Sequence, residues 1–309
     1  MQEPQLPVEP TFVQPFADLG QRVLLPEIER HNIPPVLYHY TDAKGLLGIV
    51  GNHSLWFTDV HYLNDMSERR WGLEVIRSQL SAYADKMSDV EKDMISRVFQ
   101  ELEVNSLLTR AAVFCMCEKD NLLNQWRDYG DDVVPYSIGL DSGRLASAQS
   151  FNFSPVLIKV IYVHEDQIRL ADELIKVVFE VFWKVLNQYE NLSEADRHLV
   201  VQHAASQLTF PLYWFKNPGF EAEHEWRLVR EIGHIVSSGN ATQWRAGSYG
   251  LTPYYEWGPS AKQARLPIVS STVGPSHYPD IATDALRMMM DSKGYSDVHI
   301  MWSDIPLRR

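Results

Sequence analysis

Residues 36–59, VLYHYTDAKGLLGIVGNHSLWFTD, place a strand, a capped helix and a second strand in direct succession. The run 36–40 is rich in the β-branched and aromatic residues that strands favour. Thr41-Asp42 can cap a helix that carries apolar residues up to Ile49 and ends at Gly51-Asn52. Residues 55–58 then form the second strand. This succession predicts a β-α-β opening to the main domain.

The rest of the chain mixes strands with long helical stretches. Strand patterns return at residues 111–117, 134–140, 156–163, 225–229, 266–270 and 298–302. Helical patterns cover 12–30, 67–108 with a break near 87–89, 121–129, 165–212 and 281–290, and residues 254–257 fall in a turn-rich patch. Pro26 is expected to kink or end the first helix early.

Because strands and helices do not alternate regularly, the pattern favours an α+β fold on a mixed or antiparallel sheet over a doubly wound parallel sheet. We expect an N-terminal arm and helix over 1–35, and a single domain over 36–309 with helical insertions near 67–108 and 165–212.

Composition excludes several classes of protein. The 309 residues are 45% apolar, and the formal net charge is 28 − 40 = −12. This acidity disfavours broad binding to nucleic acids or anionic membranes. No apolar run reaches the roughly 18 residues of a membrane helix. Together with the lack of a signal pattern, this predicts a cytoplasmic protein.

Standard site motifs are missing from the sequence. It contains no phosphate-binding G-x-x-x-x-G-K-[ST], no G-x-G-x-x-G, no H-E-x-x-H and no G-x-S-x-G. Cys115-Met-Cys117 places two thiols on one face of a strand, and we expect both to be core thiols. The eleven histidines show no ligand spacing, so no metal site is predicted.

The first informative cluster is LYHYT at 37–41. On a strand, Leu37, His39 and Thr41 share one face while Tyr38 and Tyr40 share the other. A histidine at a strand end, just before a helix N-terminus, can hydrogen-bond a ligand. Taken alone, His39 is better explained as a hydrogen-bonded core residue.

The second cluster is YLNDMSE at 62–68. Asn64 and Asp65 precede Ser67-Glu68, which reads as a helix start with acids near its first turn. Local capping explains this pattern as well as a site does.

The third cluster is EAEHEWRLV at 221–229. Strand alternation places Glu223, Glu225 and Arg227 on one face, and His224, Trp226 and Leu228 on the other. Since the second face belongs in a core, the charged face should line a cleft or solvent. Two carboxylates about 7 Å apart along a strand can perform separate tasks on one substrate. A solvated edge strand is the alternative.

Taken in order, these pieces resemble the bacterial family of unknown function DUF2971, over about residues 36–309. The resemblance rests on LYHYTDAKGLLGIV (37–50), SLWFTDVHYLND (54–65), AVFCMCEKDNLLNQWRDYG (112–130), SIGLD (137–141), EHEWRLV (223–229), IVSSTVGPS (268–276) and SDIPLR (303–308). We expect the insertions at 67–108 and 165–212 to depart most from relatives.

The HYT opening and the late E-x-E strand also look like the ADP-ribosyltransferase superfamily. This remoter resemblance implies a split mixed or antiparallel sheet. In that fold, the nicotinamide ribose of NAD is surrounded by a first-strand His, a middle Ser, Thr or Tyr, and a late Glu. His39 matches the first position and Glu225 the last. Tyr40, Thr58 and Tyr62 are candidates for the middle position.

The resemblance further implies roles for the residues around NAD, which would be a substrate. Glu225 would stabilise the positive charge on the ribose, Glu223 would orient or deprotonate the nucleophile, and His39 would position the dinucleotide. Trp56, Tyr40 or Trp126 would stack on a ring. The candidate cations for the pyrophosphate are Lys44, Arg69, Arg227 and Arg308. Thr41 and Asn64 are further candidate cofactor-binding residues, and residues 124–129 are expected to form a lip of the pocket.

Three functions therefore stay open. The first is an NAD-consuming ADP-ribosyltransferase, or an NAD glycohydrolase if water is the acceptor, with a role in phage defence or as a toxin. The acceptor is a protein, a nucleic-acid base, a small molecule or water. The second is a non-catalytic nucleotide-binding or sensor module of the same fold. The third is a metal-dependent hydrolase using Asn64, Asp65 and Glu68.

Overall fold

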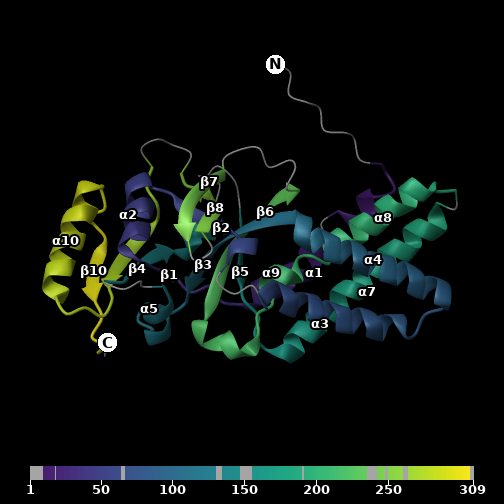
Figure 1. The fold of residues 1–309 in the computed structure, drawn as a ribbon, viewed down its shortest axis with the longest axis horizontal. Coiled ribbons are helices and arrows are strands. Elements are labelled where there is room, and N and C mark those ends of the chain that lie inside the picture. The colour runs from purple at the N-terminus through teal and green to yellow at the C-terminus, as the bar shows by residue number, and fades with distance from the viewer. Residues whose placement is uncertain are drawn as a thin grey trace, which may run out of the picture. The chain divides into compact units, whose positions relative to one another are not determined.

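The structure, a computed structural model, describes residues 10–17, 19–63, 67–129, 134–146, 155–189, 191–234, 242–247, 250–259 and 264–306. Its chain forms two compact units (Figure 1). The helical unit comprises the described residues of segments 1–30, 67–109 and 161–218, and the sheet unit those of segments 31–66, 110–160 and 219–309. The sequence regions 67–108 and 165–212 thus lie mainly in the helical unit.

The helical unit is built from antiparallel and crossing helices. Its elements are η1 (Gln14–Phe16), α1 (Leu19–Arg30), α3 (Ser67–Ala84), α4 (Asp89–Leu108), α7 (His164–Gln188), α8 (Glu194–Gln207) and α9 (Pro211–Trp214). Helix α7 packs against α1, α3 and α8, and α4 packs against α3 and α8. One face of α7, including Leu174, Val178 and Phe182, is fully buried. The break between α3 and α4 confirms the prediction of a break near 87–89.

Pro26 does not end the helix early, because α1 continues through it to Arg30. A proline inside a helix removes one backbone hydrogen bond and crowds the preceding turn. Contacts on both sides of Pro26 offset this cost. Leu24 is buried before it, and the carboxylate of Glu27 after it lies 3.0 Å from the Arg169 guanidinium of α7.

The sheet unit carries the strands and shorter helices. Its elements are β1 (Val36–Thr41), α2 (Ala43–Asn52), β2 (Leu55–Asp59), η2 (Val60–Tyr62), β3 (Thr109–Cys117), α5 (Leu123–Tyr129), β4 (Tyr136–Asp141), α6 (Ser142–Ala146), β5 (Val156–Lys159), η3 (Pro218–Glu223), β6 (Glu225–His234), β7 (Thr242–Gly247), β8 (Gly250–Trp257), β9 (Ile268–Val273), α10 (Pro279–Ser292) and β10 (His299–Trp302).

The strands form one open, mostly antiparallel sheet. Its main order is β10-β9-β4-β1-β3-β2-β8-β7, with β6 paired to β3 and β5. The β9–β10 ladder is parallel, while β1–β3, β1–β4, β2–β3, β2–β8, β4–β9, β5–β6 and β7–β8 are antiparallel. This mixed sheet confirms the α+β class.

The β-α-β opening of the sheet unit forms as predicted. The Asp42 carboxylate caps α2 by accepting the backbone N–H of Gly45 at 2.7 Å. His53 closes the helix in the left-handed region at φ 51°, one residue beyond the predicted end. Local signals are sufficient here because the cap and the apolar spacing act within one helix.

The two faces of the sheet carry different cores. Apolar residues of α2, α6 and α10, such as Ile49, Leu145 and Met290, join the main core with strand residues Leu37 and Phe57. On the other side, Trp126 of α5 packs with Tyr40 and Cys117. Side chains alternate along a strand, so β1 contributes Leu37 to one core and Tyr40 to the other.

The hairpin β7–β8 is a structural element that the sequence reading missed. Residues 254–257, interpreted as a turn-rich patch, belong to β8, which pairs with β2 and β7. Pro253 lies inside this strand, opposite Trp244, and proline is rarely found inside a sheet. The strand forms because its aromatic residues gain tertiary burial: Tyr255 and Trp257 both enter the main core.

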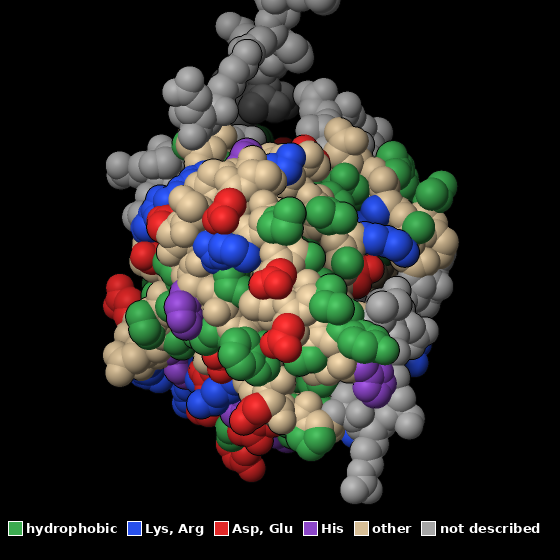
Figure 2. Space-filling view, turned by 90° about the vertical axis from the view of Figure 1, so that its left-hand side faces the viewer, with side chains coloured by type: hydrophobic (Ala, Val, Ile, Leu, Met, Phe, Trp, Pro, Cys, Tyr) green, Lys and Arg blue, Asp and Glu red, His purple; other side chains and the backbone are tan. Residues whose placement is uncertain are grey.

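The outer face of α10 is partly apolar. Tyr278, Ile281 and Met288 are exposed, as is Trp302 of the adjoining β10. Figure 2, which views the side where α10 and β10 lie in Figure 1, shows apolar side chains scattered among acidic and basic ones. Among the described helices, none is both long enough and apolar enough to cross a membrane.

Candidate functional site

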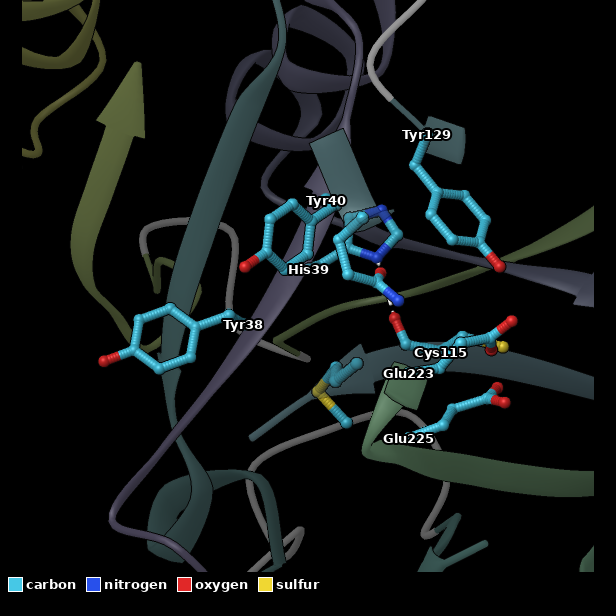
Figure 3. A pocket seen from close by; sticks show the side chains of 9 residues that line it. Tyr38, His39, Tyr40, Cys115, Tyr129, Glu223 and Glu225 are labelled. Carbon is cyan, nitrogen blue, oxygen red and sulfur yellow. Dashed lines mark hydrogen bonds between the residues drawn. The ribbon is translucent and has the colours of Figure 1, made fainter. Parts of the chain in front are cut away.

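One pocket of the sheet unit brings together residues from four segments (Figure 3). The pocket has about 310 Å³ of empty space, including the part open to solvent. The lining residues are Tyr38, His39 and Tyr40 of β1, Cys115 and Met116 of β3, Gln125 and Tyr129 of α5, and Glu223 and Glu225.

The pocket lies where β1 and β3 separate. The β1–β4 ladder runs the whole length of β1, from Val36↔Asp141 to Thr41↔Tyr136, whereas the β1–β3 ladder is described at Tyr38↔Cys117 alone. Next to that pair, the contact with β3 is made by the His39 side chain: its Nδ1 lies 2.8 Å from the Cys115 carbonyl oxygen. A side chain therefore bridges the two strands where the ladder opens.

His39 is held as a neutral imidazole. Burial and the positive charge of Arg245 lower its pKa from 6.5 to about 4, although the hydrogen bond to Cys115 acts in the opposite direction. Since a carbonyl only accepts, Nδ1 carries the proton, which leaves Nε2 as an acceptor. The ring also packs on Phe114, with centroids 4.2 Å apart. These contacts agree with a hydrogen-bonded core histidine, and the same residue lines the pocket.

Glu225, the first residue of β6, is locked in a buried ion pair. Arg227 Nε donates to Glu225 Oε1 at 2.7 Å, and Nη2 donates to Oε2 at 2.8 Å. The two residues are 5% and 2% exposed. Such a bidentate pair fixes both groups in one geometry. Of the three charged residues predicted to share a face, Arg227 thus pairs with Glu225 and is not part of the pocket lining.

Glu223 reaches the pocket by a different route from the predicted one. It ends the 3₁₀ helix η3, and His224 takes a positive φ of 48° before β6 begins at Glu225. The predicted strand alternation through Glu223 is therefore wrong, because the strand starts two residues later. The turn is anchored to β3: the His224 carbonyl accepts the Glu118 N–H at 3.2 Å, and His224 Nδ1 lies 3.3 Å from the Glu118 carboxylate.

Tyr40 and Trp126 form an anchor beside the pocket. The Tyr40 hydroxyl donates to the Lys119 carbonyl at 2.8 Å and accepts the Leu122 N–H at 3.1 Å. Burial raises the pKa of Tyr40, so the phenol keeps its proton. Its ring packs edge-on against the buried Trp126 at 4.6 Å. Both rings therefore hold α5 on the sheet.

Helix α5 forms one border of the pocket, within the lip predicted at 124–129. Gln125 and Tyr129 line the pocket, and Figure 3 shows the Tyr129 hydroxyl on the same side as the carboxylates of Glu223 and Glu225. The Asn124 amide donates to the Ala222 carbonyl at 3.0 Å, which ties α5 to η3.

Several predicted site residues lie outside the pocket lining. Thr41, Trp56, Thr58 and Tyr62 are described but do not line it. The Trp56 ring packs at a tilt against Tyr254, with the ring centroids 4.8 Å apart, and Thr58 is buried.

Of the predicted polar and cationic candidates, the described Lys44 and Arg69 do not line the pocket. Lys44 is exposed, and Arg69 of α3 donates to the Ser106 carbonyl within the helical unit. Asn64, Asp65 and Arg308 are outside the described residues, as is the side chain of Glu68.

Neither cysteine of the β3 pair is in a disulfide, and the described residues contain no group of three or more His, Cys, Asp or Glu placed to hold a metal ion. Cys117 is buried, and burial raises the pKa of its thiol to about 12. It behaves as a core thiol, as expected. Cys115, half-buried, lines the pocket.

Arg245 of β7 is a residue near this site that the sequence reading missed. Its Nη2 donates to Thr58 Oγ1 at 2.8 Å, and its charge lowers the pKa of His39. The two glycines Gly247 and Gly250, flanked by strand-type residues, are the sequence signal that could have revealed its hairpin.

Comparison with known proteins gives a family resemblance alone. A sequence model of the family described as "Protein of unknown function (DUF2971)" matches residues 125–228. This confirms the predicted resemblance over a segment that includes Gln125, Tyr129, Glu223 and Glu225. No curated protein and no solved structure matches the chain.

Proposed function

We propose that the protein is an NAD-consuming enzyme of the ADP-ribosyltransferase type. The observation that carries this proposal is that His39 and Glu225, from two distant strands, line the same pocket. These are the two positions that the resemblance assigns to the nicotinamide ribose. The proposed fold is accordingly a split sheet, and the single-pair ladder between β1 and β3 supports it.

The reaction breaks the bond between ribose C1′ and the nicotinamide nitrogen. The electron pair of that bond leaves with nicotinamide, and positive charge develops on the ribose, as in glycoside hydrolysis. A carboxylate facing this charge stabilises the transition state more than the ground state. Glu225 supplies this carboxylate, and Arg227 fixes its orientation.

The other two pocket residues have separate tasks. Glu223, which also lines the pocket, takes the proton of the nucleophile that attacks C1′. His39, neutral and rigid, uses Nε2 to accept a hydrogen bond from a ribose hydroxyl. The nicotinamide-ribose end enters this pocket, and the remainder of the dinucleotide extends outside it.

The direct test is nicotinamide release from NAD by the purified chain, followed by chromatography. Glu225→Gln should lower the rate by on the order of 10² or more, and Glu223→Gln should lower transfer or hydrolysis as well. Glu221→Gln is the matched control, because Glu221 is an exposed acid of the same segment and does not line the pocket. Thermal unfolding of each variant shows whether a lost rate reflects lost folding.

Labelled NAD incubated with a cell extract identifies the acceptor, since mass spectrometry detects ADP-ribose on a protein, a base or a small molecule. Release of free ADP-ribose alone identifies water as the acceptor. Depletion of NAD in a bacterial cell would fit a role in phage defence or as a toxin. If nicotinamide release is absent, or survives Glu225→Gln in a folded variant, the enzymatic proposal is wrong.

A second candidate function is a nucleotide-binding module without turnover. The observation that favours it is that both oxygens of Glu225 already accept hydrogen bonds from Arg227. A carboxylate used in this way stabilises the fold and offers less charge to a substrate. NAD binding measured by calorimetry, without nicotinamide release at any protein concentration, would favour this second function.

A further inference from the structure

We propose that Arg245 is the anion-binding residue of this site and holds a phosphate group of a nucleotide. This inference rests on the proposed function, which names a dinucleotide as the substrate, and adds where its phosphate binds. A chain with a net charge of −12 needs a local cation for such a group. Among the described cations considered from the sequence, Lys44 and Arg69 do not line the pocket and Arg227 is paired with Glu225.

The contacts of Arg245 leave most of its donors unused. It is half-buried on β7, opposite Thr252 of β8, and its side chain passes over β8 to reach Thr58 of β2. Among the described residues, that hydrogen bond of 2.8 Å is its one hydrogen bond, and no carboxylate lies within 4.0 Å of its guanidinium. A guanidinium has five N–H donors, so a fork remains for a phosphate.

Burial without an ion pair makes this arginine different from Arg227. Removing a charge from water is costly unless a counter-charge offsets the loss. Arg227 has that counter-charge in Glu225. For Arg245, burial lowers the pKa, and the groups that act in the opposite direction include the more distant Asp42. An anionic ligand would supply the missing counter-charge.

The position of Arg245 links it to the pocket. Its partner Thr58 lies opposite Val113 of β3, two residues, or about 7 Å, along the strand from Cys115. Cys115 lines the pocket and its carbonyl binds His39. The guanidinium therefore lies on the His39 side of the pocket. Neutral His39 does not repel it as an imidazolium would.

The experiment compares ligands that share a ribose but differ in phosphate. Calorimetry measures binding of NAD, ADP-ribose and nicotinamide riboside to the wild type, Arg245→Gln and Arg245→Lys. We expect Arg245→Gln to weaken NAD and ADP-ribose binding by about 10- to 100-fold and to change nicotinamide riboside binding by less than about threefold. Lysine should restore part of the loss, because it keeps the charge and lacks the fork.

Arg70→Gln is the matched control, since Arg70 is an exposed arginine on α3 of the helical unit and its loss changes the net charge by the same amount. Equal weakening by both variants, or unchanged NAD binding by a folded Arg245→Gln, overturns the inference while leaving the proposed function in place. Arg245-dependent binding of ADP-ribose without NAD turnover supports the inference and contradicts the enzymatic proposal. A wild type that binds neither nucleotide overturns both.

Discussion

Replacing His39 by asparagine should make the sheet unit less sensitive to acid. In the folded chain the pKa of His39 is lowered from 6.5 to about 4, first by burial and then by the charge of Arg245. Between these two values the unfolded chain binds a proton that the folded chain does not, so stability falls as the pH falls through this window. Above about pH 6.5 both states are neutral, and this contribution is constant.

The size of the effect follows from the pKa difference. A shift from 6.5 to about 4 corresponds to at most about 3 kcal/mol at about 1.36 kcal/mol per unit. By about pH 5 the wild type should have lost up to about 2 kcal/mol that the His39→Asn variant does not lose. The true value is smaller in proportion to the solvent that the half-buried ring retains. Asparagine keeps an N–H donor for the Cys115 carbonyl, so the strand contact is preserved.

The assay is urea unfolding at several pH values between about 5 and 7.5. Hydrogen exchange at the β1–β4 ladder assigns a transition to the sheet unit. His277→Asn, a change at an exposed histidine, is the control and should follow the wild type. If the unfolding free energies of wild type and His39→Asn stay parallel over the whole range, His39 is not desolvated in the folded chain and our account of the pocket is refuted.

Two further substitutions test local contacts of the sheet unit. Asp42→Ala removes the acceptor for the Gly45 N–H and should cost about 1 kcal/mol of stability, whereas asparagine at this position should cost little; urea unfolding of the two variants decides this, and equal losses would contradict the cap. Tyr40→Phe leaves the Lys119 carbonyl and the Leu122 N–H without their hydroxyl partner and should cost about 1–3 kcal/mol, with faster hydrogen exchange in α5; unchanged exchange would show that the hydroxyl does not hold this helix.

The sequence predicts those elements whose signals are local. The β1-α2-β2 opening depends on a cap, an apolar spacing and a stop signal within one short stretch, and the structure has all three. The hairpin β7–β8 depends on burial against β2, where Phe57 lies opposite Tyr255. No local pattern contains that pairing, and Pro253 argues against a strand. Tertiary burial outweighs local propensity at this point.

In the candidate site, too, features with a local sequence signal are predicted and features that depend on tertiary contacts are not. His39 and Glu225 are found from sequence because each lies in a recognisable strand pattern. The alternation that includes Glu223 fails because His224 adopts a positive φ and the strand begins later. The bidentate ion pair between Arg227 and Glu225 also cannot be predicted from the sequence pattern, since spacing alone does not distinguish an ion pair from two side chains that face a cleft.

The charges around the pocket give the two ends of the proposed site opposite signs. Glu223, Glu225 and Arg227 together carry one net negative charge, the sign that a developing ribosyl cation requires and a phosphate avoids. Arg227 cancels much of the charge of Glu225. A phosphate must then bind away from the carboxylates, and Arg245 provides the opposite sign on the His39 side. The neutral imidazole of His39 adds no charge to either end, and under the proposed function its lowered pKa therefore helps to keep the two charges distinct.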